Sequence, residues 1–262
     1  EVLGRHQIGI HDNFFELGGN SLLVISVIQQ MRQAGLHADV SSLFLAPTIA
    51  EVAAVVASDS LEIEVPPNLI PPDCKAISPD MLPLVQLTPE EIENVVAAVP
   101  GGASNIQDIY PLAPLQEGML FHHRMASEED PYIVTTVFGA ESRELLDRYL
   151  VALQLVIDRH DILRTIFLWE SLSGPVQVVC RQAGLTVEEI ELDPADGDIA
   201  KQLQERFDPR HFRLDVRQAP IIRIFIAHDA ANARWVMLRI HHHLMEDHTT
   251  DELMSEEIYE CL

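Results

Sequence analysis

The side chains best suited to chemistry are three consecutive histidines, His241, His242 and His243, followed at short spacing by Asp247 and His248. Histidine has an ordinary pKa of about 6.5, so its imidazole can accept and return a proton near neutral pH. Side chains alternate along a strand, which places His241 and His243 on one face and His242 on the other. This alternation argues against a zinc site, which needs three converging ligands. A metal site and a purely structural cluster of hydrogen-bonded histidines are the alternatives.

The segments around the histidines predict how they are positioned. Residues 235–240 are rich in apolar and β-branched side chains, which is typical of a strand. Residues 249–262 carry apolar side chains at helical spacing. The histidines therefore end a strand, cross a short loop and meet a helix, so that a rigid strand aims a titratable side chain into a cleft. We expect His122 and His123 to line the surface of a separate helix.

A serine near the other end of the chain could take part in a different kind of chemistry. Gly18 and Gly19 precede Ser21, and apolar residues recur at three- and four-residue steps over 22–31. Ser21 is thus predicted at a helix N-terminus that follows a glycine turn. A phosphate attached there would meet free backbone N–H groups and the positive end of the helix dipole. A role as a simple N-cap is the alternative that spacing alone leaves open.

Composition excludes several classes of partner. The 262 residues carry a net charge of −24, and the sequence pI is near 4.7. Such a chain is a poor ligand for nucleic acid or for an anionic membrane. No apolar run approaches the roughly 18 residues of a membrane span. The three cysteines Cys74, Cys180 and Cys261 lack metal or redox spacing, which favours a reducing, cytoplasmic location.

The chain divides into three parts by pattern. Residues 1–57 read as a small all-α segment, and residues 58–87 as a proline-rich linker. Residues 88–262 mix helices and strands without strict alternation, which predicts an α+β domain with one mixed sheet. The protein is therefore expected to be multidomain.

The first part resembles a known family. The string Asp12-x-Phe-Phe-x-Leu-Gly-Gly-x-Ser21-Leu closely resembles the signature of peptidyl carrier (thiolation) domains of non-ribosomal peptide synthetases. The resemblance implies a helical bundle whose Ser21 carries a covalent 4′-phosphopantetheine, added by a phosphopantetheinyl transferase. The family has four helices, and so little precedes residue 5 that the first helix is expected to be truncated.

The remainder resembles the N-terminal lobe of a condensation domain, with a chloramphenicol-acetyltransferase-like fold. Three strings carry the resemblance in order: residues 110–122 (YPLAPLQEGMLFH), 159–165 (RHDILRT) and 242–248 (HHLMEDH). The last is similar to the family's His-His-x-x-x-Asp-Gly core motif. His248 stands where that motif has glycine, which bears on the geometry of the loop and on the subtype of the domain.

The resemblance implies a role for each site residue. His243 assists the attack of an acceptor amine on a donor thioester, as a general base or by positioning, and His242 supports it. Asp247 holds the loop, and we propose Arg164 as its ionic partner, because a carboxylate beside an arginine stays charged. No metal ligand is implied.

The two resemblances imply that the chain functions as part of a modular peptide synthetase. An adenylation domain upstream, an acceptor carrier downstream and the second lobe of the condensation domain are the implied partners, and without that lobe the chain alone is expected to be inactive. A dual epimerising and condensing enzyme, or another acyl transferase of the superfamily, is the alternative. A non-catalytic docking or recruitment module is a second alternative, and His248 supports it. The acyl group that the carrier holds is not readable from the sequence.

Overall fold

The computed structural model describes residues 2–3, 8–19, 21–34, 36, 43–44, 46–58, 66–125, 130–246 and 248–262. The chain forms two units, Glu1–Val65 and Pro66–Leu262, which are considered separately. No described helix is long and apolar enough to cross a membrane.

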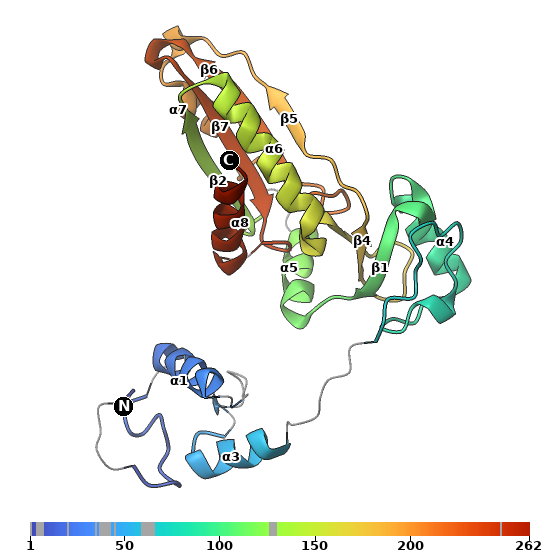
Figure 1. Cartoon of the computed structure of the whole chain (residues 1–262), viewed down its shortest axis with the longest axis vertical. Coiled ribbons are helices and arrows are strands. Elements are labelled where there is room, and N and C mark those ends of the chain that lie inside the picture. Colours follow the sequence, from blue (N-terminus) through green and yellow to red (C-terminus); the bar gives the residue numbers. More distant parts are fainter. Residues whose placement is uncertain are drawn as a thin grey trace. The chain divides into compact units, whose positions relative to one another are not determined.

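The first unit contains helices α1 (Ser21–Gln33) and α3 (Ile49–Ser58), both labelled in Figure 1. Val24, Ile28 and Leu43 form its buried cluster, against which Phe14 and Phe15 pack. Helix α3 begins with a capping box: Thr48 Oγ1 accepts from the Glu51 N–H at 3.3 Å, and the Glu51 carboxylate accepts from the Thr48 N–H at 3.2 Å.

The second unit contains the following helices and strands. The helices are α4 (Pro89–Ala98), α5 (Pro114–Met125), α6 (Arg143–Arg159), α7 (Ile199–Arg206) and α8 (His248–Cys261), with short 3₁₀ helices η1 (Pro79–Met81), η2 (Gly102–Asn105), η3 (Asp161–Arg164), η4 (Pro194–Asp196) and η5 (Ala230–Asn232). The strands are β1 (Ile106–Pro111), β2 (Ile133–Ala140), β3 (Thr165–Leu168), β4 (Val176–Cys180), β5 (Thr186–Glu189), β6 (Ile222–Asp229) and β7 (Arg234–His242).

The described strands form two sheets. A four-stranded sheet has the order β2-β7-β6-β5, in which only β5 and β6 are parallel, so it is the mixed sheet predicted from the sequence. A three-stranded antiparallel sheet, β1-β4-β3, accompanies it. Sequence alone could not separate the two sheets, because short apolar strands carry no signal of which neighbour they pair with.

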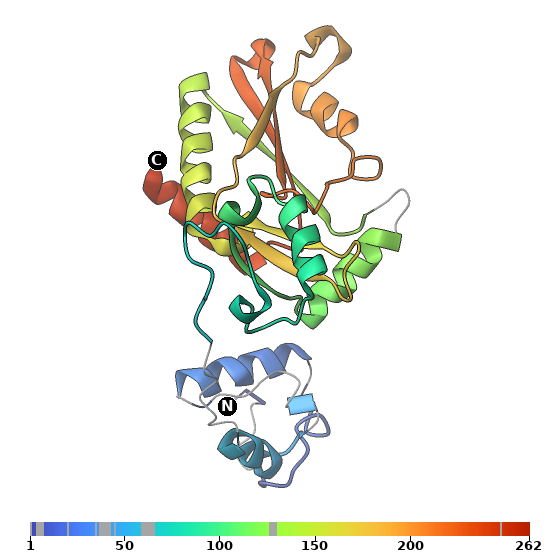
Figure 2. The same cartoon turned by 90° about the vertical axis from the view of Figure 1, so that its right-hand side faces the viewer.

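Both faces of the four-stranded sheet are covered. Figure 2 shows α6 and α7 on opposite sides of it, and the contacts agree. Phe138 on β2 packs against Tyr149 of α6, whereas Phe225 on β6 stacks on Phe207 just after α7, with ring centroids 3.6 Å apart. Strand β7 lies in the interior of the sheet, and its residues 236–242 are all buried. This double burial explains the near-continuous apolar run that ends in the histidines.

Much of the predicted proline-rich linker is packed structure. Residues 66–87 belong to the second unit, and Ile70, Cys74, Leu82 and Leu87 are buried with α4 and β1. The backbone is held as well, since Arg181 Nη2 donates to the carbonyls of residues 70 and 71 at 2.9 Å. Prolines prevent regular structure here, but the apolar residues between them supply enough burial to fix an irregular segment.

Candidate active site

The histidine cluster lies at the end of the interior strand β7. His241 pairs with Val134 of β2 and Ile222 of β6, and His242 pairs with Ile133. His243 is the first residue after the strand, and its N–H donates to the carbonyl of Tyr132 at 2.9 Å. Strands on both sides therefore fix the backbone of the cluster.

The predicted alternation of the histidines is confirmed. His241 lies on the face covered by α6 and α8, where its Nε2 is 3.6 Å from a Glu246 carboxylate oxygen. His242 lies on the opposite face and contacts Asp130. The ring centroids of His241 and His243 are 6.4 Å apart, so these two share a side.

The ring of His243 has a defined tautomer. Its Nδ1 is 2.8 Å from the backbone carbonyl oxygen of Glu246. A carbonyl can only accept, so Nδ1 carries the proton and the lone pair of the neutral ring resides on Nε2. The residue is partly exposed, unlike its two buried neighbours His241 and His242. His243 is thus arranged to accept a proton at Nε2.

His242 has the opposite tautomer. The N–H of Leu244 donates to Nδ1 of His242 at 3.0 Å, so the ring proton resides on Nε2. That nitrogen is 3.2 Å from Oδ2 of Asp130, to which it donates. The ring is fully buried, and burial lowers its pKa even though Asp130 opposes the shift. His242 therefore holds the loop that follows it and stays neutral.

Asp130 joins His242 to a second histidine. His123 Nδ1 lies 2.5 Å from the same Oδ2 atom, and the N–H of Tyr132 donates to Oδ1 at 3.1 Å. Burial alone would raise the pKa of Asp130, but the hydrogen bonds from the two histidines outweigh it and hold that pKa well below its ordinary range. The expectation that His123 lines a helix surface is wrong: it is 6% exposed, because it faces this carboxylate from α5.

His123, Asp130 and His242 are the described trio with the composition of a metal site, since their ligand atoms lie within 4.8 Å of one another. Their hydrogen bonding fits a metal poorly. The Nδ1 lone pair of His242 is occupied by Leu244 and its Nε2 carries the proton, so the ring has no free lone pair. The distance between the two atoms is also too short. Two ligand atoms that each bind one tetrahedral ion at about 2.0–2.2 Å would be much further apart than the 2.5 Å between His123 Nδ1 and Asp130 Oδ2.

The first of the resembling strings, residues 110–122, contacts the loop after His243. Gln116 Nε2 donates to the carbonyl of Leu244 at 3.3 Å, and Gln177 Nε2 donates to Gln116 Oε1 at 3.2 Å. Gln116 Oε1 also accepts from the Ala113 N–H at 2.9 Å, at the start of α5. One glutamine therefore connects the start of α5, strand β4 and the histidine loop.

Arg164, from the second string, is buried where α6 meets β3. It donates to Asp161 at 2.6 Å, to Gln107 Oε1 at 3.2 Å, to the carbonyl of Ile157 at 3.2 Å and to that of Cys180. Asp247, its predicted partner, lies outside the described residues, so that ion pair stays a prediction.

Ser21, the predicted attachment site, is the first residue of α1. Its side chain lies outside what the structure describes, but the turn before it is defined. Gly18 has φ +100, and a Cβ at Gly19 would overlap the ring of Phe14, so both positions require glycine. A serine hydroxyl that opens a 13-residue helix fits a phosphodiester, since the N–H groups of the first turn stabilise a phosphate.

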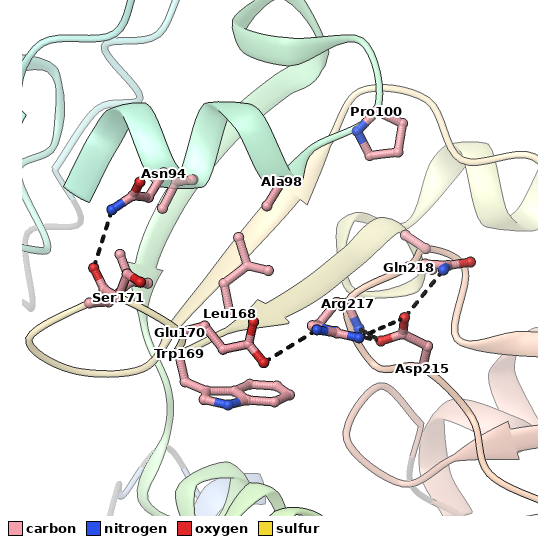
Figure 3. A pocket seen from close by; sticks show the side chains of 13 residues that line it. Asn94, Ala98, Pro100, Leu168, Trp169, Glu170, Ser171, Asp215, Arg217 and Gln218 are labelled. Atoms are coloured by element: carbon pink, nitrogen blue, oxygen red, sulfur yellow. Dashed lines mark hydrogen bonds and ion pairs between the residues drawn. The ribbon is translucent and has the colours of Figure 1, made fainter. Parts of the chain in front are cut away.

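A separate cavity of about 580 Å³ lies between α4, the β3–β4 connection and residues 215–219 (Figure 3). Trp169 lines it and is flanked by the guanidinium groups of Arg124 and Arg217, 5.6 and 6.0 Å from the ring centroid. Arg217 also bridges Glu170 and Asp215. None of the three clustered histidines lines this cavity.

Comparison with known proteins identifies the families of the two parts of the chain. Residues 106–260 match the condensation domain family, and residues 1–56 match the phosphopantetheine attachment site. The chain belongs to the condensation domain family, and a phosphopantetheine attachment domain precedes the condensation domain. The cofactor predicted for Ser21 is therefore the one that its domain carries.

The chain is similar to two synthetases of Mortierella alpina. Malpinin synthetase and malpibaldin synthetase are each 48% identical to it over 258 residues, which is 98% of this chain but only 3% and 5% of theirs. The structure of a four-domain nonribosomal peptide synthetase bound to AMP and glycine matches 60% of the chain and 12% of its own, with a TM-score of 0.51 and 15% identity. The predicted chloramphenicol-acetyltransferase-like α+β fold is confirmed.

Proposed function

We propose that this chain is part of a modular non-ribosomal peptide synthetase. Its carrier domain tethers an aminoacyl or peptidyl thioester on phosphopantetheine at Ser21. Its condensation domain forms an amide between a carrier-bound donor thioester and an acceptor amine. The observation that carries the proposal is the ring of His243, whose Nδ1 proton is engaged by the Glu246 carbonyl so that Nε2 is left as the acceptor.

In this reaction the protein needs to supply only the positioning of the substrates and one proton transfer. A thioester is already activated, so holding the amine in line supplies much of the acceleration. The amine nitrogen forms the bond to the thioester carbon, and Nε2 of His243 takes the proton that the nitrogen loses. The carbon–sulfur bond breaks, and the departing thiolate receives that proton. Atoms and charge balance without an external reactant.

His242, Asp130 and His123 support this residue without touching the reacting atoms. His242 fixes the Leu244 N–H, and Asp130 fixes the tautomer of His242. Asp247 is proposed to hold the same loop, with Arg164 as its ionic partner. The four described partners of Arg164 support a role in bracing the junction of α6 and β3.

A dual epimerising and condensing enzyme is the second candidate. Epimerisation requires a proton to be removed from Cα and returned on the opposite face, so it needs a second proton-transfer group beside His243. His123 and Asp130 are the neighbouring imidazole and carboxylate, since both ring nitrogens of His242 are already engaged. Stereochemical analysis of the carrier-bound peptide before and after condensation separates the two. If the peptide keeps its configuration through condensation and the Asp130→Asn variant still forms the amide, the dual function is ruled out.

The proposal extends to partners and location. We propose as partners a phosphopantetheinyl transferase, an upstream adenylation domain, a downstream acceptor carrier and a second condensation lobe. A cytoplasmic location is also proposed. Its support is that Cys74, Cys180 and Cys261 are all free thiols.

The carrier half is tested by mass. Incubation with a phosphopantetheinyl transferase and coenzyme A is expected to add one phosphopantetheinyl group to the intact protein, and Ser21→Ala is expected to abolish the gain. Ser26→Ala, which changes an exposed serine five residues further along α1, is the matched control and is expected to load fully. Loading of Ser21→Ala would overturn the assignment.

A further inference from the structure

A cluster of charged side chains lies beneath the loop that holds His243. Arg239 Nη2 is 3.1 Å from Glu246 Oε1 and 2.5 Å from Asp251 Oδ1. His241 Nε2 is 3.6 Å from the same Glu246 oxygen. The arginine and the histidine come from β7, Glu246 from the loop, and Asp251 from α8. One cation therefore faces two carboxyl groups on the side of the sheet covered by α6 and α8.

The members of the cluster differ sharply in burial. The side chains of Arg239 and Glu246 are 2% and 1% exposed, whereas that of Asp251 is 45% exposed. The guanidinium of Arg239 lies over the ring of Phe138 on β2, 5.9 Å from its centroid, and Tyr149 of α6 is near enough to influence the pKa of Arg239. Arg239 Nε, His241 Nδ1 and Glu246 Oε2 have no hydrogen-bond partner within the described part of the chain. The cluster is thus closed to solvent except at Asp251.

Proton occupancy follows from this burial. Desolvation raises the pKa of Glu246 to about 8, against the pull of Arg239, and the hydrogen bond with Asp251 adds to the rise. The pKa of Asp251 is lowered: burial opposes that shift, but its hydrogen bonds with Glu246 and Arg239 outweigh burial. At neutral pH the proton is therefore on Glu246 and the negative charge is on Asp251, so the cluster is neutral overall.

Glu246 also holds the ring of His243 with its backbone. Its carbonyl oxygen accepts the Nδ1 proton at 2.8 Å, and the intervening loop is short, with the Met245 N–H donating to the carbonyl of His242 at 3.2 Å. The position of this carbonyl depends on where the Glu246 side chain is anchored. That anchor is the pair formed by Arg239 on β7 and Asp251 on α8.

We propose that Glu246 is a positioning residue of the condensation site, whose side chain, held by Arg239 and Asp251, fixes the carbonyl that orients His243. The inference rests on the role proposed for His243. The protonated form of the Glu246 carboxyl is the one that fits between Arg239 and Asp251. Its ionisation would bury a second negative charge beside Asp251, with a single guanidinium to balance both and with neutral His241 and Tyr149 as the other neighbours. The loop would then have to move, and the orientation of His243 would be lost.

The test uses the complete synthetase, with both condensation lobes and loaded carriers, and measures kcat, KM and the pH profile of single-turnover amide formation. Glu246→Ala is expected to lower kcat about tenfold to a hundredfold with KM nearly unchanged, because the ring is misoriented while substrate binding is not. Glu246→Gln reproduces the neutral carboxyl and is expected to restore kcat at pH 7. Glu256→Gln, an exposed position on α8, is the matched control and is expected to match the wild type.

The alkaline limb of the pH profile of kcat distinguishes a positioning role of Glu246 from a purely structural one. Wild-type kcat is expected to fall roughly tenfold per pH unit above pH 8 as Glu246 ionises, and Glu246→Gln is expected to lack this fall. A Glu246→Ala enzyme with wild-type kcat, or a Glu246→Gln enzyme with an unchanged alkaline limb, would overturn the proposal. His243→Ala is run beside them. If it retains full activity, the proposed role of His243 fails; if it is inactive while Glu246→Ala is active, only the positioning role fails.

Discussion

Asp130 and His242 are 112 positions apart in the sequence, yet Oδ2 of one lies 3.2 Å from Nε2 of the other. The same oxygen is 2.5 Å from Nδ1 of His123, so one buried carboxylate binds a helix and the end of a strand. This contact sets the tautomer of His242 and, through the Leu244 N–H, the course of the loop that carries His243.

Asp130→Ala is expected to destabilise the second unit. It leaves two buried imidazole N–H groups unpaired, at a cost of roughly 2–4 kcal/mol in the free energy of unfolding. Trp169 and Trp235 both lie in this unit, so urea denaturation followed by tryptophan fluorescence reports on it. Asp196→Ala, at an exposed position, serves as the control. Equal urea midpoints for the two variants would refute the network.

The same carboxylate predicts acid sensitivity. Its pKa is lowered in the folded state, so the stability it contributes is present above the ordinary pKa of 3.8 and is lost as the pH falls. The urea midpoint of the wild type is expected to decline below about pH 4 more steeply than that of Asp130→Asn. Parallel curves for the two proteins would count against the assignment.

Glu246 and His241 give stability opposite dependences on pH. The pKa of Glu246 is raised from 4.5 to about 8, so stability falls as the pH rises through that window. The pKa of His241 is lowered from 6.5 to about 3, by burial first and then by Arg239, so stability falls as the pH drops below 6.5. The two effects oppose each other between pH 4.5 and 6.5, and only Glu246 acts above 6.5.

Between pH 6.5 and 8 the wild type is therefore expected to lose about 2 kcal/mol of unfolding free energy, at about 1.4 kcal/mol per pH unit. Glu246→Gln is expected to lose none of this. Urea denaturation at the two pH values measures the difference. A wild-type curve that is flat over this window would show that Glu246 is already ionised at pH 6.5.

Gln116→Ala is expected to loosen the histidine loop without removing a reacting group. It loses the donor to the Leu244 carbonyl and the cap at the start of α5, each worth about 1 kcal/mol. Amide formation by the complete synthetase should slow about fivefold to tenfold. Glu117→Ala changes an exposed neighbour on the same helix and should leave the rate unchanged. Equal rates for the two variants would show that Gln116 does not support the histidine loop.

Gly19→Ala tests the turn before the carrier serine. A Cβ there would overlap the Phe14 ring, so the turn is expected to distort and phosphopantetheine loading of Ser21 to slow. Gly184→Ala is the control, because a Cβ there meets open space and its backbone is not in the left-handed region. The initial rate of loading, followed by intact-protein mass, decides between them. Full-rate loading of Gly19→Ala would contradict the steric argument.

The sequence predicted the elements around the site well, because their signals are local. The strand at 235–240 and the helix at 249–262 are β7 and α8, and the alternation of the histidines follows from strand geometry alone. Asp130, His123 and Gln116 were missed as parts of the site because their contacts are long-range and each residue type is ordinary in its local setting. Glu246 was missed because its importance lies in burial beside Arg239, which no spacing rule reveals.

The packing of residues 66–87 could not be predicted from the sequence, for a related reason. The proline content of this stretch predicts a linker, but it says nothing about whether an irregular segment is buried. Ile70 and Leu82 are 4% exposed, against α4 and the three-stranded sheet. A local pattern reports backbone conformation, whereas burial depends on which distant surface the segment meets.

In the proposed reaction, Nε2 of His243 accepts the amine proton during amide formation. The most direct measurement is the single-turnover rate of the complete synthetase with a preloaded donor and acceptor, comparing His243→Ala with His211→Ala, an exposed histidine outside the cluster. His243→Ala is expected to slow amide formation by about a hundredfold or more while carrier loading is unchanged. Wild-type rates in both variants would contradict it.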